Sequence, residues 1–273
     1  MKPYYAFMVL LILGACSAEP SRQYGEKIVN ERYVIDGREL SYARKVSLEY
    51  SNQGGSREFQ YKTSVGKIAI SGGDANENRL ELIIYESEPG DARVELVDGR
   101  FVVSSKSRSP VGLGDLSGTV PRNASLTLAS TTGTIDISNI DAASRVQLSS
   151  TSGAVSVARV TAYGFDARTS SGGVNVANCK FQDANASTAG GAVEFKDSDV
   201  LGSLAIKTAS GHVALRGREY SNVSISGASS NITFNKCRIV AARASTVSGT
   251  IDAVDTTFVK TPNLISTSGA VNR

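Results

Sequence analysis

The acidic residues are the first candidates for chemistry in this sequence. Paired carboxylates act as general acid and base in glycoside hydrolases, and clustered carboxylates bind calcium. The candidates fall into two groups, a spaced set of Asp136, Glu194 and Asp252, and a clustered set of Asp183, Asp197 and Asp199. A catalytic pair needs its carboxyl groups within about 10 Å of each other. Whether either set can catalyse a reaction or bind calcium therefore depends on which residues the fold brings together.

The other candidates for catalysis or metal binding are one histidine and three cysteines. His212 is the only histidine, and no cysteine stands at metal-site spacing from it. The sequence contains no Ser-His-Asp series, nucleotide-binding loop or metalloprotease motif. We therefore predict a protein that is not an enzyme and that has no cofactor and no metal site.

The elements that would position these residues are short repeats. From residue 131 onward, a glycine followed by alternating apolar residues returns every 19 or 20 residues. The eight anchor residues of this phrase are Gly133, Gly153, Gly172, Gly191, Gly211, Ser230, Gly249 and Gly269. Self-similarity at a fixed short period indicates one structural unit stacked on copies of itself.

Within each repeat, apolar residues alternate with small or polar ones, which is the pattern of a strand. One apolar pair follows the anchor by two and four residues, as do Val155 and Val157 after Gly153. A second pair precedes the anchor by seven and five residues, as do Val146 and Leu148. A third, weaker stretch follows the second strand. Each repeat therefore predicts two firm strands and a third short one.

These observations predict an all-β fold, a single-stranded β-helix (β-solenoid) with 19–20 residues per turn. Consecutive turns would pair as parallel strands about 4.8 Å apart, and the crossover rule favours a right-handed coil. We expect the anchor glycines to supply a positive φ at a tight corner. Ser and Thr stand three residues before most anchors, and their hydroxyls would bridge turns or satisfy corner backbone groups. An antiparallel sandwich also has regularly spaced strands, but it would not keep one corner residue through seven periods.

A solenoid would separate the candidate residues. The spaced set would lie on one outward row, three turns between neighbours, and would form no carboxylate pair. The clustered set fits a solvated turn better than a calcium site. His212 takes an outward, solvent-exposed position. Cys179 and Cys237 share one repeat position three turns apart, roughly 14 Å, so we predict two free, buried thiols rather than a disulfide.

The N-terminus predicts an exported, lipid-anchored protein. Lys2 precedes an apolar run that ends in Leu13-Gly14-Ala15-Cys16, similar to a bacterial lipoprotein signal of residues 1–15. Cys16 would then carry the lipid, although an ordinary secretory leader is the alternative. Ser17 is not the aspartate that retains lipoproteins at the inner membrane of enteric bacteria, which favours the outer membrane. Residues 16–27 would form a polar tether.

The rest of the chain predicts a head followed by the repeats. Residues 28–117 indicate a β-rich cap with the first repeat-like strands, and residues 118–273 the regular solenoid. Asp98-Gly99 predicts a hairpin, and residues 107–118 predict a loop. Without residues 1–15 the chain has 28 basic and 26 acidic residues, a net charge of +2, and no basic patch for nucleic acid.

The phrases GKIAISGG at 66–73, VPRNASLTLASTTGTIDIS at 120–138 and the SSG and TSG repeats downstream resemble the bacterial toast-rack, adhesin-like repeat families. The resemblance covers about three quarters of the chain, residues 66–273. It implies a single-stranded β-helix, export and frequent lipidation. It implies no activity, because the repeats consist of structural residues.

Three functional interpretations follow. The first is a non-catalytic envelope protein whose solenoid faces contact other proteins or glycans. The second is an envelope scaffold or sensor that acts through the head, which an exposed patch of Tyr33, Tyr42, Tyr50, Phe59 and Tyr61 would favour. The third is a carbohydrate-active enzyme, which an acidic cleft of Asp91, Asp98 and Asp115 would favour. In addition, an open strand edge at the last turn predicts weak self-association.

Overall fold

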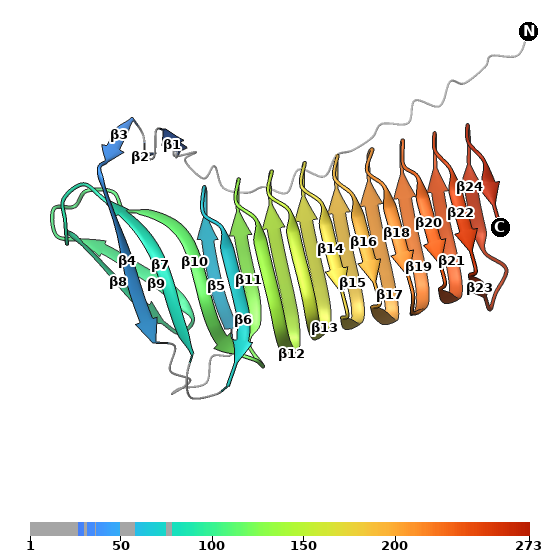
Figure 1. The fold of residues 1–273 in the computed structure, drawn as a ribbon, viewed down its shortest axis with the longest axis horizontal. Helices are drawn as coiled ribbons and strands as arrows, with labels where there is room; N and C mark the ends of the chain where they lie inside the picture. Colours follow the sequence, from blue (N-terminus) through green and yellow to red (C-terminus); the bar gives the residue numbers. More distant parts are fainter. Residues whose placement is uncertain (1–26, 30–31, 36, 50–57, 75–77) are drawn as a thin grey trace, which may run out of the picture.

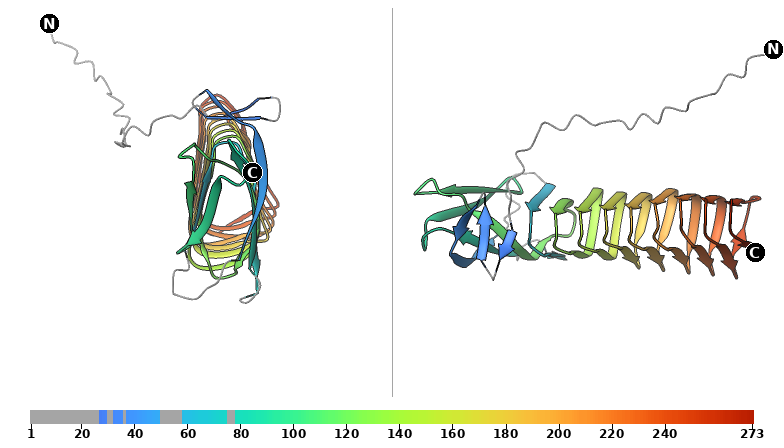
Figure 2. Two further views of the ribbon diagram at one scale, coloured as in Figure 1. Left: turned by 90° about the vertical axis from the view of Figure 1, so that its left-hand side faces the viewer. Right: turned by 90° about the horizontal axis from the view of Figure 1, so that it is seen from above.

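A computed structural model describes residues 27–29, 32–35, 37–49, 58–74 and 78–273. The regular elements in these ranges are all strands, and the described part of the chain has no helix able to cross a membrane. The predicted signal peptide and Cys16 lie outside the described residues, as does the tether up to residue 26. Figures 1 and 2 show a long stack of flat turns with a separate group of strands at its N-terminal end.

The predicted β-solenoid is confirmed. Val155 pairs in parallel with Ile135 of the preceding turn and with Val174 of the next, and both valines are fully buried. The strands of the stack are β11 (Ser125–Ser130), β12 (Ile135–Ser150), β13 (Val155–Thr169), β14 (Val174–Ala177), β15 (Lys180–Thr188), β16 (Val193–Lys196), β17 (Asp199–Thr208), β18 (Val213–Arg216), β19 (Glu219–Gly227), β20 (Ile232–Asn235), β21 (Arg238–Thr246), β22 (Ile251–Val254), β23 (Thr257–Phe258), β24 (Asn263–Ser266) and β25 (Val271–Asn272). The handedness of the coil stays a prediction.

The core is a narrow column of aliphatic and aromatic side chains inside the stack. The two predicted apolar rows point inward, and the third stretch joins them through buried Val160 and Phe181. Phe165 stacks on Phe181 with ring centroids 4.7 Å apart. Burial of each large apolar side chain contributes about 1.5–3 kcal/mol, and it requires the neighbouring turns to be in place.

The first corner of each turn lies at the anchor residue, and the reason predicted for its glycines is wrong. Of the anchor glycines, only Gly249 has a positive φ. A Cβ on Gly191 would instead lie 2.0 Å from the carbonyl oxygen of Gly172 in the preceding turn, and Gly153 is equally close to Gly133. At the seven glycine anchors, glycine is required because a Cβ would collide with the backbone of the preceding turn.

Hydroxyl groups connect the turns at the first corner, as predicted. The Oγ of Ser150 accepts a hydrogen bond from the N–H of Gly153 at 3.0 Å and donates one to the carbonyl of Gly133 at 3.2 Å. Ser266 makes the same two bonds, to Gly269 at 2.9 Å and Gly249 at 2.7 Å. These side chains satisfy backbone groups that the corner would otherwise leave unpaired.

The second corner, six residues after the anchor, holds the positive φ angles. A left-handed backbone recurs there after each of the first seven anchors, with φ between 48° and 80°. The residues at this corner are Asn139, Arg159, Asn178, Asp197, Gly217, Lys236 and Asp255. Asn, Asp and Gly tolerate this conformation, whereas for Arg and Lys it costs roughly 1–2 kcal/mol.

The third corner absorbs the difference between turns of 19 and 20 residues. Between β12 and β13, Ala142 pairs with Ala162, but the next pair joins Arg145 to Gly164, so one residue of β12 is left over. Each of the three 20-residue turns has its extra residue at this corner, between 142 and 145, between 200 and 204, and between 258 and 263.

The head adds antiparallel strands to the first solenoid turn. Its strands are β1 (Lys27–Val29), β2 (Arg32–Ile35), β3 (Arg38–Leu40), β4 (Tyr42–Glu49), β5 (Glu58–Thr63), β6 (Ile68–Gly73), β7 (Arg79–Glu86), β8 (Ala92–Val97), β9 (Arg100–Ser105) and β10 (Gly112–Pro121). β5 and β6 already belong to the stack, because Phe59 pairs with Leu126 and Ile68 with Ile135, both in parallel. The predicted hairpin at Asp98-Gly99 joins β8 to β9.

The loop predicted at residues 107–118 is wrong from Gly112 onward, where β10 begins. β10 runs parallel to β6 on one side and antiparallel to β7 on the other. Its glycines leave room for aromatic rings: a Cβ on Gly112 would lie 2.8 Å from Tyr33, and one on Gly114 would lie 2.7 Å from Tyr85. The glycines that suggested a loop therefore serve close packing within a strand.

Candidate functional site

The carboxylates of the spaced set have separate partners. Asp136 forms an ion pair with the Nζ of Lys67 at 3.0 Å, and Glu194 forms one with the Nε of Arg216 at 3.1 Å. Asp252 accepts a hydrogen bond from the Nδ2 of Asn272. Within the described ranges, no three or more His, Cys, Asp or Glu residues gather as metal ligands would. The spacing predicted from the repeat therefore holds.

The residues of the clustered set have separate roles in the backbone of neighbouring turns. Asp183 accepts hydrogen bonds from the N–H and hydroxyl of Ser203 at 2.8 and 2.7 Å, which lower the pKa of its carboxyl. Asp199 accepts from the N–H of Glu219 at 3.3 Å, and Asp197 occupies the second corner. The carboxylates of Asp183 and Asp199 therefore each bind a residue of the next turn.

His212 and the cysteines lie where the repeat predicts. His212 is exposed on the outward row. Cys179 and Cys237 are free and buried, and burial raises the pKa of both thiols. The Sγ of Cys179 donates to the carbonyl of Ala177 at 3.2 Å and accepts from the N–H of Val160 at 3.4 Å. Both cysteines are therefore structural residues with little thiolate character.

The described part of the head does not form the exposed aromatic patch that would favour a scaffold or sensor. Tyr33, Phe59 and Tyr61 are buried, whereas Tyr42 is 46% exposed. Tyr50 lies outside the described residues. Tyr33 packs on Tyr85 with ring centroids 4.5 Å apart. The aromatic residues of the described head therefore form packing contacts rather than a binding surface.

The three acidic residues proposed for a cleft also lie apart. Asp91 is buried and accepts hydrogen bonds from the hydroxyls of Ser105 and Ser107 at 2.8 and 2.7 Å. Asp98 forms the β8–β9 turn with a φ of 49°. Asp115 accepts from the N–H of Lys67 at 2.8 Å. The carboxylates of Asp91 and Asp115 therefore hold different local segments, through the N–H groups of Ser107 and Lys67.

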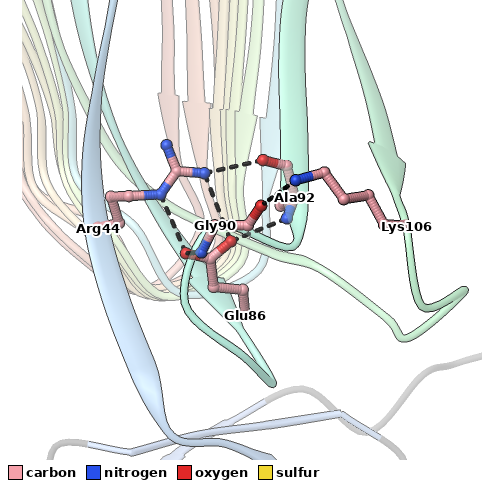
Figure 3. A network of polar contacts seen from close by, with 5 residues as sticks. All are labelled: Arg44, Glu86, Gly90, Ala92 and Lys106. Carbon is pink, nitrogen blue, oxygen red and sulfur yellow. Dashed lines mark hydrogen bonds and ion pairs between the residues drawn. The ribbon is translucent and has the colours of Figure 1, made fainter.

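A partly buried ion pair that the sequence reasoning missed fixes the turn between β7 and β8 (Figure 3). Glu86 is 1% exposed and receives the Nε of Arg44 at 3.0 Å, together with the N–H groups of Gly90 and Ala92, both at 2.9 Å. Burial acts to raise the pKa of Glu86, but these donors together outweigh it and hold the pKa below its ordinary value. Nothing in the one-dimensional spacing of residues 44 and 86 signals this pair, because it depends on the antiparallel pairing of β4 with β7.

A polar depression of the described surface lies where the head meets the solenoid. It has a volume of about 560 Å³ and lies between the ends of β6 and β10 and the second corner of the first turns. We call it the Arg122–Arg159 hollow; its lining includes Asp74, Arg122, Asn139, Asp141, Arg159 and Thr161. The sequence reasoning did not identify it. The signal available was an arginine at position 159, where the repeat otherwise favours Asn, Asp or Gly.

The solenoid with its antiparallel head defines a class of β-helical protein made of structural repeats. A family model, described as Toastrack DUF4097, matches residues 41–272, and the chain belongs to this family. No curated protein matches the sequence significantly.

Solved structures support the same fold. A "putative adhesin" from Parabacteroides merdae is similar with a TM-score of 0.56 at 12% identity, over 85% of this chain and 95% of the other. A "putative adhesin" from Parabacteroides distasonis gives 0.55 at 12% identity, over 85% and 96%. A "putative lipid binding protein" from the same species gives 0.52 at 15% identity, over 85% and 97%. At these identities the similarity establishes the fold alone.

Proposed function

We propose that this protein is a non-catalytic, lipid-anchored protein of the bacterial cell envelope that presents its solenoid surface to other proteins or to glycans. The observation that carries this proposal is the row of hydroxyls along the first corner. The residue directly before the anchor is exposed in every turn, and it is Thr132, Ser152, Ser171, Ser210, Ser229, Ser248 or Ser268 in all turns but one. Such a repeating polar surface suits many weak, parallel contacts with an extended partner.

The surface role agrees with the names of the two similar "putative adhesin" structures. The alternative role, a scaffold or sensor acting through the head, has less support because Tyr33, Phe59 and Tyr61 are buried. The carbohydrate-active enzyme also has less support, because Asp91 and Asp115 accept hydrogen bonds from separate backbone N–H groups, those of Ser107 and Lys67.

The anchor is tested by metabolic labelling with an alkyne fatty acid in a bacterial host. Wild type is expected to carry the label and to fractionate with the outer membrane, whereas Cys16→Ala should lose both properties. Cys179→Ser is the matched control and should keep the label. Labelled Cys16→Ala protein would refute anchoring at this residue.

The surface role is tested by a binding screen of the lipid-free exported chain against envelope glycans and envelope proteins. We expect at least one ligand whose binding survives in Asp136→Asn and Glu194→Gln, because a non-catalytic surface does not depend on these carboxylates. Turnover of a polysaccharide that either substitution abolishes would contradict the proposal and support an enzyme.

We also propose weak self-association through the last turn, with a second copy of the chain as the occupant. Val271 of β25, the strand that pairs with β22, is 37% exposed, and Ile265 of the neighbouring β24 is 52% exposed. An open strand edge with apolar neighbours favours pairing with another edge. Light scattering should show concentration-dependent dimers that Ile265→Lys weakens; a monomer at all concentrations would refute this.

A further inference from the structure

We infer that the Arg122–Arg159 hollow is a binding site for an acidic saccharide, which would make glycans the partners of the surface role proposed above. The inference rests on that proposed function and adds the place and the chemical class of the ligand. The hollow is large enough for a small-molecule ligand, since binding sites commonly measure about 300–1,000 Å³.

Two arginines from different parts of the chain line the hollow, together with Asn139. The Nε of Arg159 donates to the Oδ1 of Asn139 at 2.7 Å, which orients the guanidinium. The stem of Arg122 crosses Gly72, where a Cβ would lie 2.9 Å from its Cγ and 1.9 Å from the carbonyl oxygen of Asn139. The absence of a side chain at Gly72 therefore leaves room for the stem of Arg122, which lines the hollow.

The two arginines differ in their ionic partners. The Nε of Arg122 lies 3.8 Å from Asp74, whose side chain is 94% exposed, so this pair is loose. No carboxylate lies within ion-pair distance of Arg159 among the described residues, its side chain is exposed, and its one hydrogen bond to Asn139 uses Nε and not the terminal nitrogens. An arginine fork of this kind suits a ligand carboxylate, which it can bind through two parallel hydrogen bonds.

The remaining lining favours a sugar over other anions. Asp74 and Asp141 offer acceptors for hydroxyl groups, and Asn139 and Thr161 offer both donors and acceptors. The same two carboxylates repel a densely acidic peptide. A single phosphate would leave most of the 560 Å³ unfilled. A saccharide with one carboxylate per ring matches both the cations and the hydroxyl-binding groups.

The backbone conformation of the second corner allows the role of Arg159 to be tested with a matched control. Arg159 has a φ of 53°, a conformation that glycine adopts without strain, so Arg159→Gly removes the guanidinium without threatening the fold. Lys236 has a φ of 55° at the same corner four turns away and does not line the hollow. Lys236→Gly is therefore a matched control that removes one positive charge from the same structural position.

The experiment titrates trigalacturonic acid into the lipid-free exported chain by calorimetry at low ionic strength. Wild type is expected to bind, and Arg159→Gly should weaken binding about tenfold, the loss expected for one charge-assisted contact. Arg122→Gln should weaken it less, and Lys236→Gly should leave it unchanged. Neutral maltotriose should bind much more weakly than the acidic sugar.

Several outcomes would overturn the inference. These are no binding of trigalacturonic acid, equal binding by Arg159→Gly, equal binding of maltotriose, and equal affinity for inorganic phosphate. Tighter, Arg159-dependent binding of a hexaglutamate peptide would identify an acidic protein partner instead. An envelope ligand from the screen whose affinity Arg159→Gly leaves unchanged would keep the surface role and refute this site. Arg159-dependent sugar binding without any envelope ligand would keep the site and refute the role.

Discussion

The side chain of Ser230 occupies the space that Gly227 leaves empty. A Cβ on Gly227 would lie 2.5 Å from the Oγ and 2.6 Å from the Cβ of Ser230. Every other turn has the reverse order, a Ser or Thr followed three residues later by the anchor glycine. In this turn the two residue types have exchanged positions, and the buried hydroxyl of Ser230 has no hydrogen-bond partner in the described structure.

This exchange predicts strong coupling between the two positions. Gly227→Thr alone should lower the free energy of unfolding by about 2–3 kcal/mol, because its Cβ collides with Ser230. Ser230→Gly alone should cost about 1 kcal/mol through added backbone freedom. The double variant restores the order of the other turns, so we expect a favourable coupling energy of about 1–3 kcal/mol in urea unfolding. Additive effects would show that the two side-chain positions do not share one space.

Neighbouring glycines at the first corner should respond oppositely to alanine. Gly191→Ala places a methyl 2.0 Å from the carbonyl oxygen of Gly172 and should destabilise the protein by about 3 kcal/mol. For Gly190, the nearest atom to an added Cβ is the carbonyl oxygen of Ser170 at 4.0 Å. Gly190→Ala should therefore be neutral or stabilising by about 0.5 kcal/mol. Thermal unfolding of both variants measures the contrast, and equal losses would contradict the close approach of turns.

The second corner predicts a stabilising substitution of a charged residue. Lys236→Gly removes the strain of a left-handed backbone conformation, but it also increases the conformational entropy of the unfolded chain. We therefore expect the free energy of unfolding to rise by about 0.5–1 kcal/mol. Gly217→Ala should lower the free energy of unfolding by a similar amount, because alanine is strained in this left-handed conformation. Asn178→Gly is the control and should change little, since asparagine tolerates this conformation. Urea unfolding that ranks the lysine variant below wild type would refute the assignment of strain.

The Arg44–Glu86 pair predicts acid sensitivity of the head. Because the folded-state pKa of Glu86 is lowered, its contribution is complete above the ordinary glutamate pKa and is lost as pH falls through the lowered value. Glu86→Gln should cost about 2 kcal/mol at neutral pH. It should also flatten the fall in stability below about pH 4.5. Glu81, which forms an exposed ion pair with Lys45, provides the control Glu81→Gln with a smaller effect. A Glu86→Gln profile parallel to that of wild type would contradict this.

The repeat was predictable from sequence because its cause is local and recurs in register. Val155 and Val174 stand two residues after their anchors, and stacking alone places them in the column between turns. The same register correctly separated Cys179 from Cys237 and Asp136 from Glu194. Because successive turns pair in parallel and in register, the number of repeats between two equivalent residues gives the number of strand spacings that separate them.

The hollow and the head could not be predicted in this way. Arg122 reaches the hollow through a strand, β10, whose glycines resemble those of a loop until Tyr33 and Tyr85 are seen to pack on them. The role of the anchor glycines was also misjudged, because positive φ and close backbone approach both select glycine. The clue that distinguishes them is the Asn, Asp and Gly series six residues later, which marks the left-handed corner directly.

The confinement of every extra residue to the third corner has a consequence for how such proteins change. At the first corner backbones touch, and at the second a special conformation is imposed, so neither tolerates added length. The third corner already accepts one residue more or less while the strands on either side keep their partners. Insertions and grafted peptides should be accommodated there, which makes this edge the natural place for the family to vary in sequence and for engineers to display foreign segments at intervals of one strand spacing.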